Sequence, residues 1–249
     1  MNKLEQAIIL AAGSSQRLKS LTSDKPKSFL EINGTKIIER HLDFLSKVGI
    51  KKVLIVVGFM KEKFKTLIGN SYNDLEICYI DCDEYYKWNH SWSFFLTREV
   101  IEQSNQNLII VHADTYYEFE TLKKLVSFNC NDVVLADPDF KIKTNDELLV
   151  YGQDGFVRNI DAIDNKGDRI IGEFIGLHKM SLLFFTEFCN FLDAFFVEND
   201  KKQGYDKLLG LFVNYSDIKL QYLEIFENWV NINYKEDYLQ AKKIGESSK

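Results

Sequence analysis

Apolar residues in the first half of the chain fall into short continuous runs, separated by stretches in which they recur every three or four positions. The continuous runs at 6–12, 52–57 and 108–111 are rich in aliphatic and β-branched residues. Runs of this length and type are typical of strands that are buried on both faces, as in a parallel sheet. The pattern therefore predicts three central strands.

Helical spacing fills the intervals between these runs. The stretch 35–48 is followed by Gly49, a frequent residue just past the end of a helix, and 60–68 and 91–103 show similar spacing. Strands that alternate with helices indicate β-α-β units with helices on both faces of the sheet. We therefore expect an α/β fold, Rossmann-like, with three α/β/α layers and a mostly parallel sheet.

The pattern becomes less regular after Asp132, where turn signals occur at 154–155 and 166–167. No linker, repeat or shift in composition marks a boundary, so we expect a single domain over 1–249 with a small β-rich lid region. The expected strands are 148–151, 156–163 and 169–179, and the expected helices are 182–196, 205–213 and 234–244.

Composition and charge exclude several classes of protein. A hydrophobic content of 45% is ample for a core, and a net charge of −6 without a basic stripe argues against nucleic-acid binding. The four cysteines form no C-x-x-C pair and no zinc spacing with the four histidines, which favours free thiols in a reducing compartment. We read no signal peptide and no apolar stretch near the roughly 18 residues that a membrane span needs, so a cytoplasmic protein without a membrane partner is expected.

The first apolar run ends at Gly13 and leads through a polar loop to Arg17 and then to Lys27, which follows a proline. A buried strand that stops at a glycine leaves backbone N–H groups that can face a phosphate, and the two cations add the charge that a polyphosphate requires. The spacing fits neither the Walker A loop nor G-x-G-x-x-G. The alternative is an ordinary turn followed by a solvated basic loop.

Asp114 is the best candidate for a metal ligand. It lies just past the run 108–111, so it is expected at the carboxyl edge of the sheet, where ligands bind in open α/β folds. Mg²⁺ is usually held by one or two carboxylates together with phosphate oxygens and water. An aspartate that caps a following helix is the alternative interpretation.

Residues 10–18, with Pro26 and Lys27, resemble the signature of the nucleotidylyltransferases, Leu-Ala-Ala-Gly-x-x-x-Arg-Leu followed by Pro-Lys. These enzymes join a nucleoside monophosphate to a phosphorylated small molecule and release pyrophosphate. Ser15 stands where the signature often has a glycine. The resemblance implies a nucleotide-binding half at 1–130 and an acceptor-binding half at 131–249.

The same resemblance implies roles for individual residues. Catalytic roles fall to Arg17, on the β and γ phosphates, and to Lys27, at the α-phosphorus, while Asp114 would hold Mg²⁺. The nucleotide-binding residues implied around the loop are Leu10, Ala11, Ala12, Gly13, Ser14, Arg17, Lys27 and Ala113.

Three later segments, at 85–96, 149–157 and 229–238, are similar to the bacterial type of phosphocholine cytidylyltransferase. That similarity implies that Asn89 and Ser93 lie near the base and sugar of CTP. Capping of a helix that begins near Ser91 is the alternative for both.

The late segment departs from the family pattern Glu-Ile-Asp-x-x-x-Asp. The matching residues run from Asn231 to Asp237, so the second metal position is Asn233. An amide oxygen can coordinate Mg²⁺ but carries no charge, so a lower affinity is expected. This departure leaves open a catalytically inactive, nucleotide-binding regulatory subunit.

The acceptor site is implied by the same similarity, with Glu147, Tyr151 and Glu173 as its residues. Glu147 stands where the family has an aromatic residue, and a carboxylate suits a primary ammonium better than a trimethylammonium. A cage built from Trp88, Trp92 and Trp229 is the alternative.

The sequence therefore predicts an Mg²⁺-dependent cytidylyltransferase. Its partners would be CTP and a small amine-bearing acceptor, such as aminoethylphosphonate, phosphocholine or a phosphorylated amino acid or amide, and its product would serve surface polysaccharide modification. A sugar-1-phosphate nucleotidylyltransferase that uses UTP or dTTP is the alternative within the enzymes. The sequence leaves a homodimer open.

Overall fold

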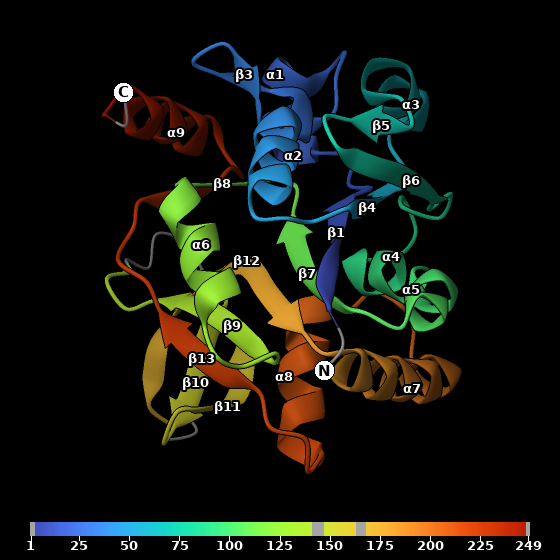
Figure 1. Ribbon diagram of the computed structural model, residues 1–249, viewed down its shortest axis with the longest axis vertical. Helices are drawn as coiled ribbons and strands as arrows, with labels where there is room; N and C mark the ends of the chain where they lie inside the picture. The colour runs from blue at the N-terminus through green and yellow to red at the C-terminus, as the bar shows by residue number, and fades with distance from the viewer. Residues whose placement is uncertain (1–2, 141–146, 163–167, 248–249) are drawn as a thin grey trace.

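Strands and helices alternate through the first half of the chain in the computed structural model, which describes residues 3–140, 147–162 and 168–247 (Figure 1). β1 (Leu4–Ala11) lies between β4 (Lys52–Val57) and β7 (Asn107–His112) and is parallel to both. β6 (Leu75–Asp81) continues the parallel set beside β4, and β5 (Ser71–Tyr72) closes this edge antiparallel. The carboxyl ends of the parallel strands therefore meet at one edge of the sheet.

Two cores form because alternate residues of each parallel strand face opposite sides of the sheet. Ile8 and Ile110 belong to one core, whereas Ile9 and Ile109 belong to the other. This arrangement confirms the expected three layers. The first core is covered by α4 (His90–Phe95), α5 (Arg98–Ser104), α7 (Leu182–Glu198) and α8 (Tyr205–Tyr215), and the second by α2 (Ile37–Lys47), α3 (Lys61–Ile68) and α6 (Phe119–Ser127).

A smaller core joins the segment after β1 to the end of the chain. Leu18 and Tyr116 pack there with Val230, Ile232 and Ala241. The helices around it are the 3-10 helices η1 (Gln16–Leu18) and η2 (Lys27–Phe29), the short α1 (Lys19–Thr22) and α9 (Lys235–Ser247). Two strand pairs complete it, β2 (Glu31–Ile32) with β3 (Thr35–Lys36), and β8 (Thr115–Tyr117) with β14 (Trp229–Asn231).

The β-rich part is continuous with the main sheet. β12 (Ile170–Met180) is antiparallel to β7 near its end and antiparallel to β10 (Leu149–Gln153) near its start. With β11 (Phe156–Asp161), β13 (Gln221–Glu224) and β9 (Val133–Asp137), these strands pair in a closed circuit, β9–β12–β10–β11–β13–β9. Parallel pairing therefore dominates the first half of the sheet, and antiparallel pairing dominates the second.

Several predicted elements differ in detail. The helix expected at 91–103 breaks at Thr97, whose hydroxyl donates to the carbonyl of Phe94 at 2.7 Å, so that α4 and α5 are separate helices. β6, β9 and α6 were not predicted, since none of them has a long apolar run or an extended helical period. The turn at 154–155 is confirmed by positive φ angles of 53° at Asp154 and 83° at Gly155. Ile163 and the turn at 166–167 lie outside the described residues.

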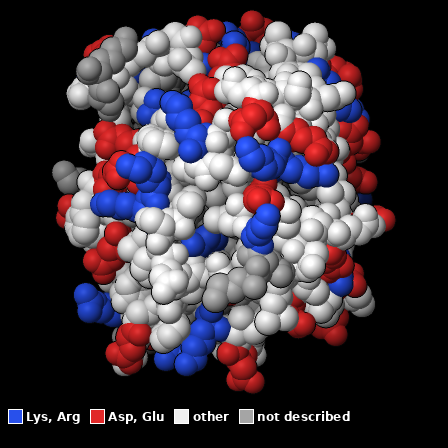
Figure 2. Space-filling view, viewed as in Figure 1, with Lys and Arg blue, Asp and Glu red and all other residues white. Residues whose placement is uncertain are grey.

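Two surface properties bear on the expected partners. In the part of the chain that the structure describes, no helix has the length and apolar character needed to cross a membrane. On the face shown in Figure 2, Lys and Arg are interspersed with Asp and Glu, which agrees with the absence of a basic stripe from the sequence.

Candidate active site

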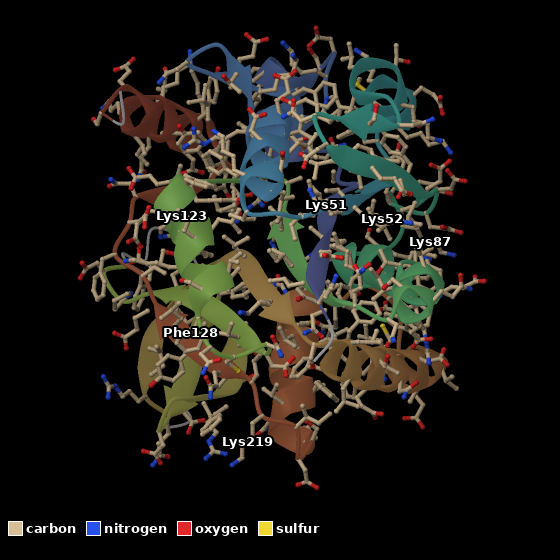
Figure 3. The ribbon with its side chains drawn as sticks, viewed as in Figure 1. Lys51, Lys52, Lys87, Lys123, Phe128 and Lys219 are labelled. Atoms are coloured by element: carbon tan, nitrogen blue, oxygen red, sulfur yellow. The ribbon has the colours of Figure 1, made fainter. Side chains whose placement is uncertain are left out.

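Two cavities adjoin at the carboxyl edge of the parallel strands. The smaller, of about 230 Å³, is lined by the loop after β1 together with Lys27 and Asp114. The larger, of about 680 Å³, is lined by β12, β14 and the start of α9. Arg17 and Asn233 line both, so they stand at the junction. Lys51 and Lys52, labelled in Figure 3, mark the opposite edge of the sheet at the start of β4.

The loop after β1 is an open backbone surface. A Cβ placed on Gly13 would meet no atom within 4 Å, so the space above this residue is free for a ligand. The loop then turns through Ser15, which has a φ of 53°, into η1, where Leu18 N–H donates to the Ser15 carbonyl at 3.0 Å. This geometry leaves room for a phosphate against the backbone, as the sequence predicts.

Ser15→Gly is expected to stabilise the protein by about 0.5–1 kcal/mol. The left-handed conformation costs a non-glycine residue about 1–2 kcal/mol, and the greater freedom of glycine in the unfolded chain offsets part of that gain. Urea unfolding measures the difference. Ser14→Gly is the matched control, because Ser14 has no positive φ angle. Equal destabilisation by both changes would contradict the prediction.

Lys27 and Asp114 form the centre of the smaller cavity. The Lys27 ammonium lies 2.8 Å from Asp114 Oδ2 and 3.3 Å from Asn233 Oδ1. Burial alone would raise the pKa of Asp114, but the positive charge of Lys27, followed by that of His112, outweighs it and lowers the pKa to about 2. Asp114 is therefore a carboxylate at neutral pH. It lies in the turn between β7 and β8 and caps no helix.

Asn233 is held in place from two sides. The backbone N–H groups of Asn233 and Tyr234 donate to Asp237 Oδ2 at 2.9 and 2.8 Å, which anchors the segment at the start of α9. The Arg17 guanidinium donates to Asn233 Oδ1 at 2.9 Å and lies 5.2 Å from the centre of the Tyr234 ring. The end of the chain therefore closes over the loop that follows β1.

The oxygens of Asp114 and Asn233 suit a hard divalent cation. Both oxygens contact the Lys27 ammonium, so the carboxylate and the amide oxygen already share one positively charged group. Within the described ranges, no group of three or more His, Cys, Asp or Glu side chains is placed to hold a metal by itself. A metal here would complete its coordination with water or with oxygens of a bound phosphate.

The larger cavity is strongly acidic. Glu147 and Glu173 both line it, as the sequence predicts for an acceptor site. Arg17 is the only lysine or arginine among its described lining residues. The carboxylates are Asp137, Asp139, Glu147, Glu173, Asp206, Glu236 and Asp237, and the aromatic residues are Phe140, Phe174, Trp229 and Tyr234.

Most of the loop residues that the sequence singled out gather around the smaller cavity. The carbonyl of Ala12, which is outside the lining, accepts from Phe59 N–H at 3.0 Å. Ser14, also outside it, accepts from the Gln16 side chain at 3.2 Å. The expected nucleotide-binding residues in the lining are Leu10, Ala11, Gly13, Arg17, Lys27 and Ala113.

Three expected site residues lie away from both cavities. Asn89 caps α4 by accepting from His90 N–H at 2.7 Å, and Ser93 is buried with its hydroxyl 3.5 Å from Cys82 Sγ. Tyr151 is also buried, and its hydroxyl donates to the carbonyl of Ala162 at 3.1 Å. The geometry of Asn89 is the capping alternative, and contact of these residues with a ligand stays a prediction.

The tryptophans do not form a common cage. Trp229 lines the larger cavity and donates from Nε1 to Asp137 Oδ2 at 2.8 Å. Trp92 instead packs on Phe95 beside α7, and neither it nor Trp88 lines either cavity. A cation in the larger cavity would therefore meet at most one of the three indoles.

The sequence model of the family described as Nucleotidyl transferase matches residues 6–134, which contain the loop, Lys27 and Asp114. The chain belongs to this family. It is 28% identical over 253 residues to the CTP:phosphoglutamine cytidylyltransferase of Campylobacter jejuni, which covers 93% of this chain and 96% of that protein. It is 31% identical over 166 residues to the choline-phosphate cytidylyltransferase of Streptococcus pneumoniae, which covers 67% of each.

The fold agrees with this assignment. A solved structure of the CTP:phosphocholine cytidylyltransferase from Streptococcus pneumoniae superposes with a TM-score of 0.76 at 23% identity and covers 98% of this chain and 99% of that one. The family signature, the sheet and the position of Lys27 and Asp114 together make this chain a nucleotidyltransferase.

Sequence reasoning missed a buried cluster at the floor of this nucleotidyltransferase's larger cavity. Asp206, on α8, has its Oδ2 2.9 Å from His90 Nε2 and its Oδ1 3.4 Å from His112 Nε2. Next to it, Tyr205 bonds through its hydroxyl to His178. Three of the four histidines therefore meet here, although 116 residues separate His90 from Asp206.

Burial and the neighbouring charges shift the pKa values of Asp206, His90 and His112 in this cluster. Burial alone would raise the pKa of Asp206, but His112 and His90 outweigh it, so the pKa lies below its usual value. Burial likewise favours a lower pKa for His90, but the Asp206 carboxylate outweighs it and raises that pKa. For His112, burial prevails and the pKa is lowered. Asp206 is therefore an anion, and its carboxylate favours the protonated form of His90.

Proposed function

We propose that this nucleotidyltransferase is an Mg²⁺-dependent cytidylyltransferase that transfers CMP from CTP to a small, amine-bearing phosphate or phosphonate and releases pyrophosphate. The observation that carries the proposal is the acidic cavity beside Lys27 and Asp114, because seven carboxylates against one arginine among its described lining residues favour a cationic acceptor. The product would serve surface polysaccharide modification.

The choice of CTP is supported by the relatives. One is named for CTP and phosphoglutamine and the other for choline phosphate and a cytidylyl group, and the first aligns along nearly its whole length. Both acceptors carry nitrogen. The resemblance of 85–96 to cytidylyltransferases supports the same donor.

Each site residue has its own role in an in-line transfer, in which an acceptor oxygen attacks the α-phosphorus and pyrophosphate leaves. The loop backbone at Gly13 holds the triphosphate, and Arg17, at the junction of the cavities, binds its β and γ phosphates. Lys27 neutralises charge that develops at the α-phosphorus. Asp114 and Asn233 would hold Mg²⁺, which when bound neutralises phosphate charge and orients the oxygens.

A primary ammonium or another N–H group fits the cavity better than a trimethylammonium. Glu173, on β12, and Glu147, two residues before β10, both line its wall, and Leu149 at the start of β10 pairs with Glu173 in the sheet. Carboxylates bind a group that donates hydrogen bonds, whereas a quaternary ammonium is enclosed by aromatic faces. We therefore expect acceptors that carry N–H to be preferred over phosphocholine.

Pyrophosphate release with MgCTP tests the proposal. The acceptor panel is phosphocholine, phosphoethanolamine, aminoethylphosphonate, phosphorylated amino acids and amides, and sugar-1-phosphates. Product with CTP and an amine-bearing or amide acceptor supports it. Turnover only with UTP or dTTP and a sugar-1-phosphate would replace it by the sugar-nucleotide alternative, and CTP binding without any product would favour a regulatory subunit.

Asn233→Asp is expected to raise the affinity for Mn²⁺ in the absence of nucleotide by about tenfold or more. The change places a second carboxylate beside Asp114, and charged oxygens bind hard cations more strongly than amide oxygens. Electron paramagnetic resonance of free Mn²⁺ measures the binding directly. Asn228→Asp, at an exposed position before β14, is the control. Unchanged Mn²⁺ affinity in Asn233→Asp would remove this residue from the metal site.

A further inference from the structure

Three buried polar atoms in the larger cavity have no hydrogen-bond partner within the described part of the chain. They are His112 Nε2, Asp206 Oδ1 and Asn231 Oδ1, and all three residues line the cavity. The Asp206 side chain is only 4% exposed. A buried carboxylate oxygen without a donor is costly, so this atom points to a ligand group that the protein itself does not supply.

The protein satisfies only one of the two Asp206 oxygens. His90 Nε2 lies 2.9 Å from Asp206 Oδ2, and His90 Nδ1 lies 2.6 Å from Asn89 Oδ1. Both of these oxygens only accept hydrogen bonds, so His90 donates from both ring nitrogens. Asp206 Oδ1 has no hydrogen-bond donor among the described residues; it lies 3.4 Å from His112 Nε2, in a residue that lines the cavity.

The His112 imidazole is closely packed on two sides. β12 passes His112 at Gly176, where φ is +74° and a Cβ would come within 2.7 Å of His112 Cγ. The Phe174 ring packs edge-on against the same imidazole, with 5.9 Å between ring centres. His112 is therefore held by close packing, and Asp206 by its bond to His90.

Resting on the proposed function, we propose that Asp206 determines acceptor specificity by accepting a hydrogen bond from an acceptor nitrogen through Oδ1. The acceptor must carry N–H, which a primary ammonium or an amide supplies and a trimethylammonium does not. A site built to pair a substrate N–H rejects the analogue that lacks it far more strongly than an apolar pocket rejects an extra methyl group.

Stepwise methylation of the acceptor tests this in the unmodified protein. With MgCTP, kcat/KM is measured for phosphoethanolamine, its N-methyl and N,N-dimethyl derivatives, phosphocholine, and a carboxamide phosphorylated on nitrogen. We expect kcat/KM to fall about 100-fold or more when the last N–H is lost. Turnover of the phosphorylated amide without turnover of the amines would identify the amide as the source of the N–H.

Asp206→Asn tests the residue itself. The amide keeps the shape, and with its oxygen toward His90 it presents a donor to the cavity. We expect kcat/KM for the preferred N–H acceptor to fall about 100-fold, mainly through KM, with the KM for CTP and turnover of phosphocholine unchanged. Asp83→Asn, at an exposed carboxylate that pairs with Lys61 and lines neither cavity, is the matched control for charge.

The outcomes separate the two proposals. Equal loss with all acceptors in Asp206→Asn, or equal loss in Asp83→Asn, would overturn the specific role of Asp206. Phosphocholine used as well as phosphoethanolamine by the unmodified protein would overturn it too while leaving the cytidylyltransferase proposal intact. No product with any acceptor would overturn both. If Asp206→Asn fails to fold, the methylation series alone decides.

Discussion

Lys27→Ala is expected to lower kcat about 100-fold or more. The Lys27 ammonium is the cation nearest the Asp114 carboxylate, at 2.8 Å, and it lines the cavity that the open loop forms. Loss of one charge or donor aimed at a transition state typically costs about 2.7–4 kcal/mol, which corresponds to this range of rate. The measurement is steady-state pyrophosphate release at saturating MgCTP, with the acceptor that the panel identifies.

Two controls accompany this change. Lys25→Ala removes a lysine two positions away that lines neither cavity, and it should leave kcat unchanged. Urea unfolding of Lys27→Ala should show a loss of about 1–3 kcal/mol, since Asp114 is left without its partner, but a folded protein at 25 °C. A kcat within threefold of the original would remove Lys27 from the transfer step.

Asp114→Asn is expected to lower kcat about 1,000-fold. The change removes the one carboxylate that faces Lys27, and with it the charge that would hold Mg²⁺ beside Asn233. The pKa of about 2 means that this charge is present at every pH at which activity would be measured. Turnover and Mn²⁺ binding in the presence of CTP should therefore fall together.

Asp83→Asn is the matched control for Asp114→Asn. Asp83 is exposed and pairs with Lys61 at 2.7 Å on the surface, away from both cavities. Its replacement should change neither Mn²⁺ binding nor kcat. Unimpaired Mn²⁺ binding by Asp114→Asn would place the metal elsewhere, even if turnover fell.

Local patterns in the sequence were sufficient for the first half of the fold. The runs that became β1, β4 and β7 are continuous and apolar because both faces of those strands are buried. β6 was not predicted because it is half exposed and has no continuous apolar run. β9 was not predicted because its short apolar run lies where the pattern becomes less regular. The break at Thr97 depends on a hydroxyl that bonds back to the helix, which spacing alone does not reveal.

The phosphate side of the candidate site could also be predicted from the sequence, for a physical reason. Gly13, Arg17 and Lys27 follow one another within the short segment after β1, so their spacing already restricts where they lie. Asp114 required one further step, that parallel strands end at the same edge. Even the departure at Asn233 is visible in the sequence, and the structure adds that Arg17 and Lys27 both contact its oxygen.

The acceptor side was decided by tertiary structure. Apolar and polar residues alternate from Val230 to Asn233, but this period does not tell which side chains line the larger cavity, since Val230 and Asn231 both do. Their position depends on the pairing of β14 with β8. Asp206 lies on a helix whose pattern indicates only an apolar face, and its charge faces His90 and His112 from distant elements. Residues that are close in sequence are restricted by local backbone geometry. Asp206, His90 and His112 instead meet because β12 joins the closed circuit of strands to β7, and because α8 packs against β11 of that circuit. The sequence alone determined the nucleotidyltransferase chemistry, and the tertiary structure decided which carboxylates line the larger cavity.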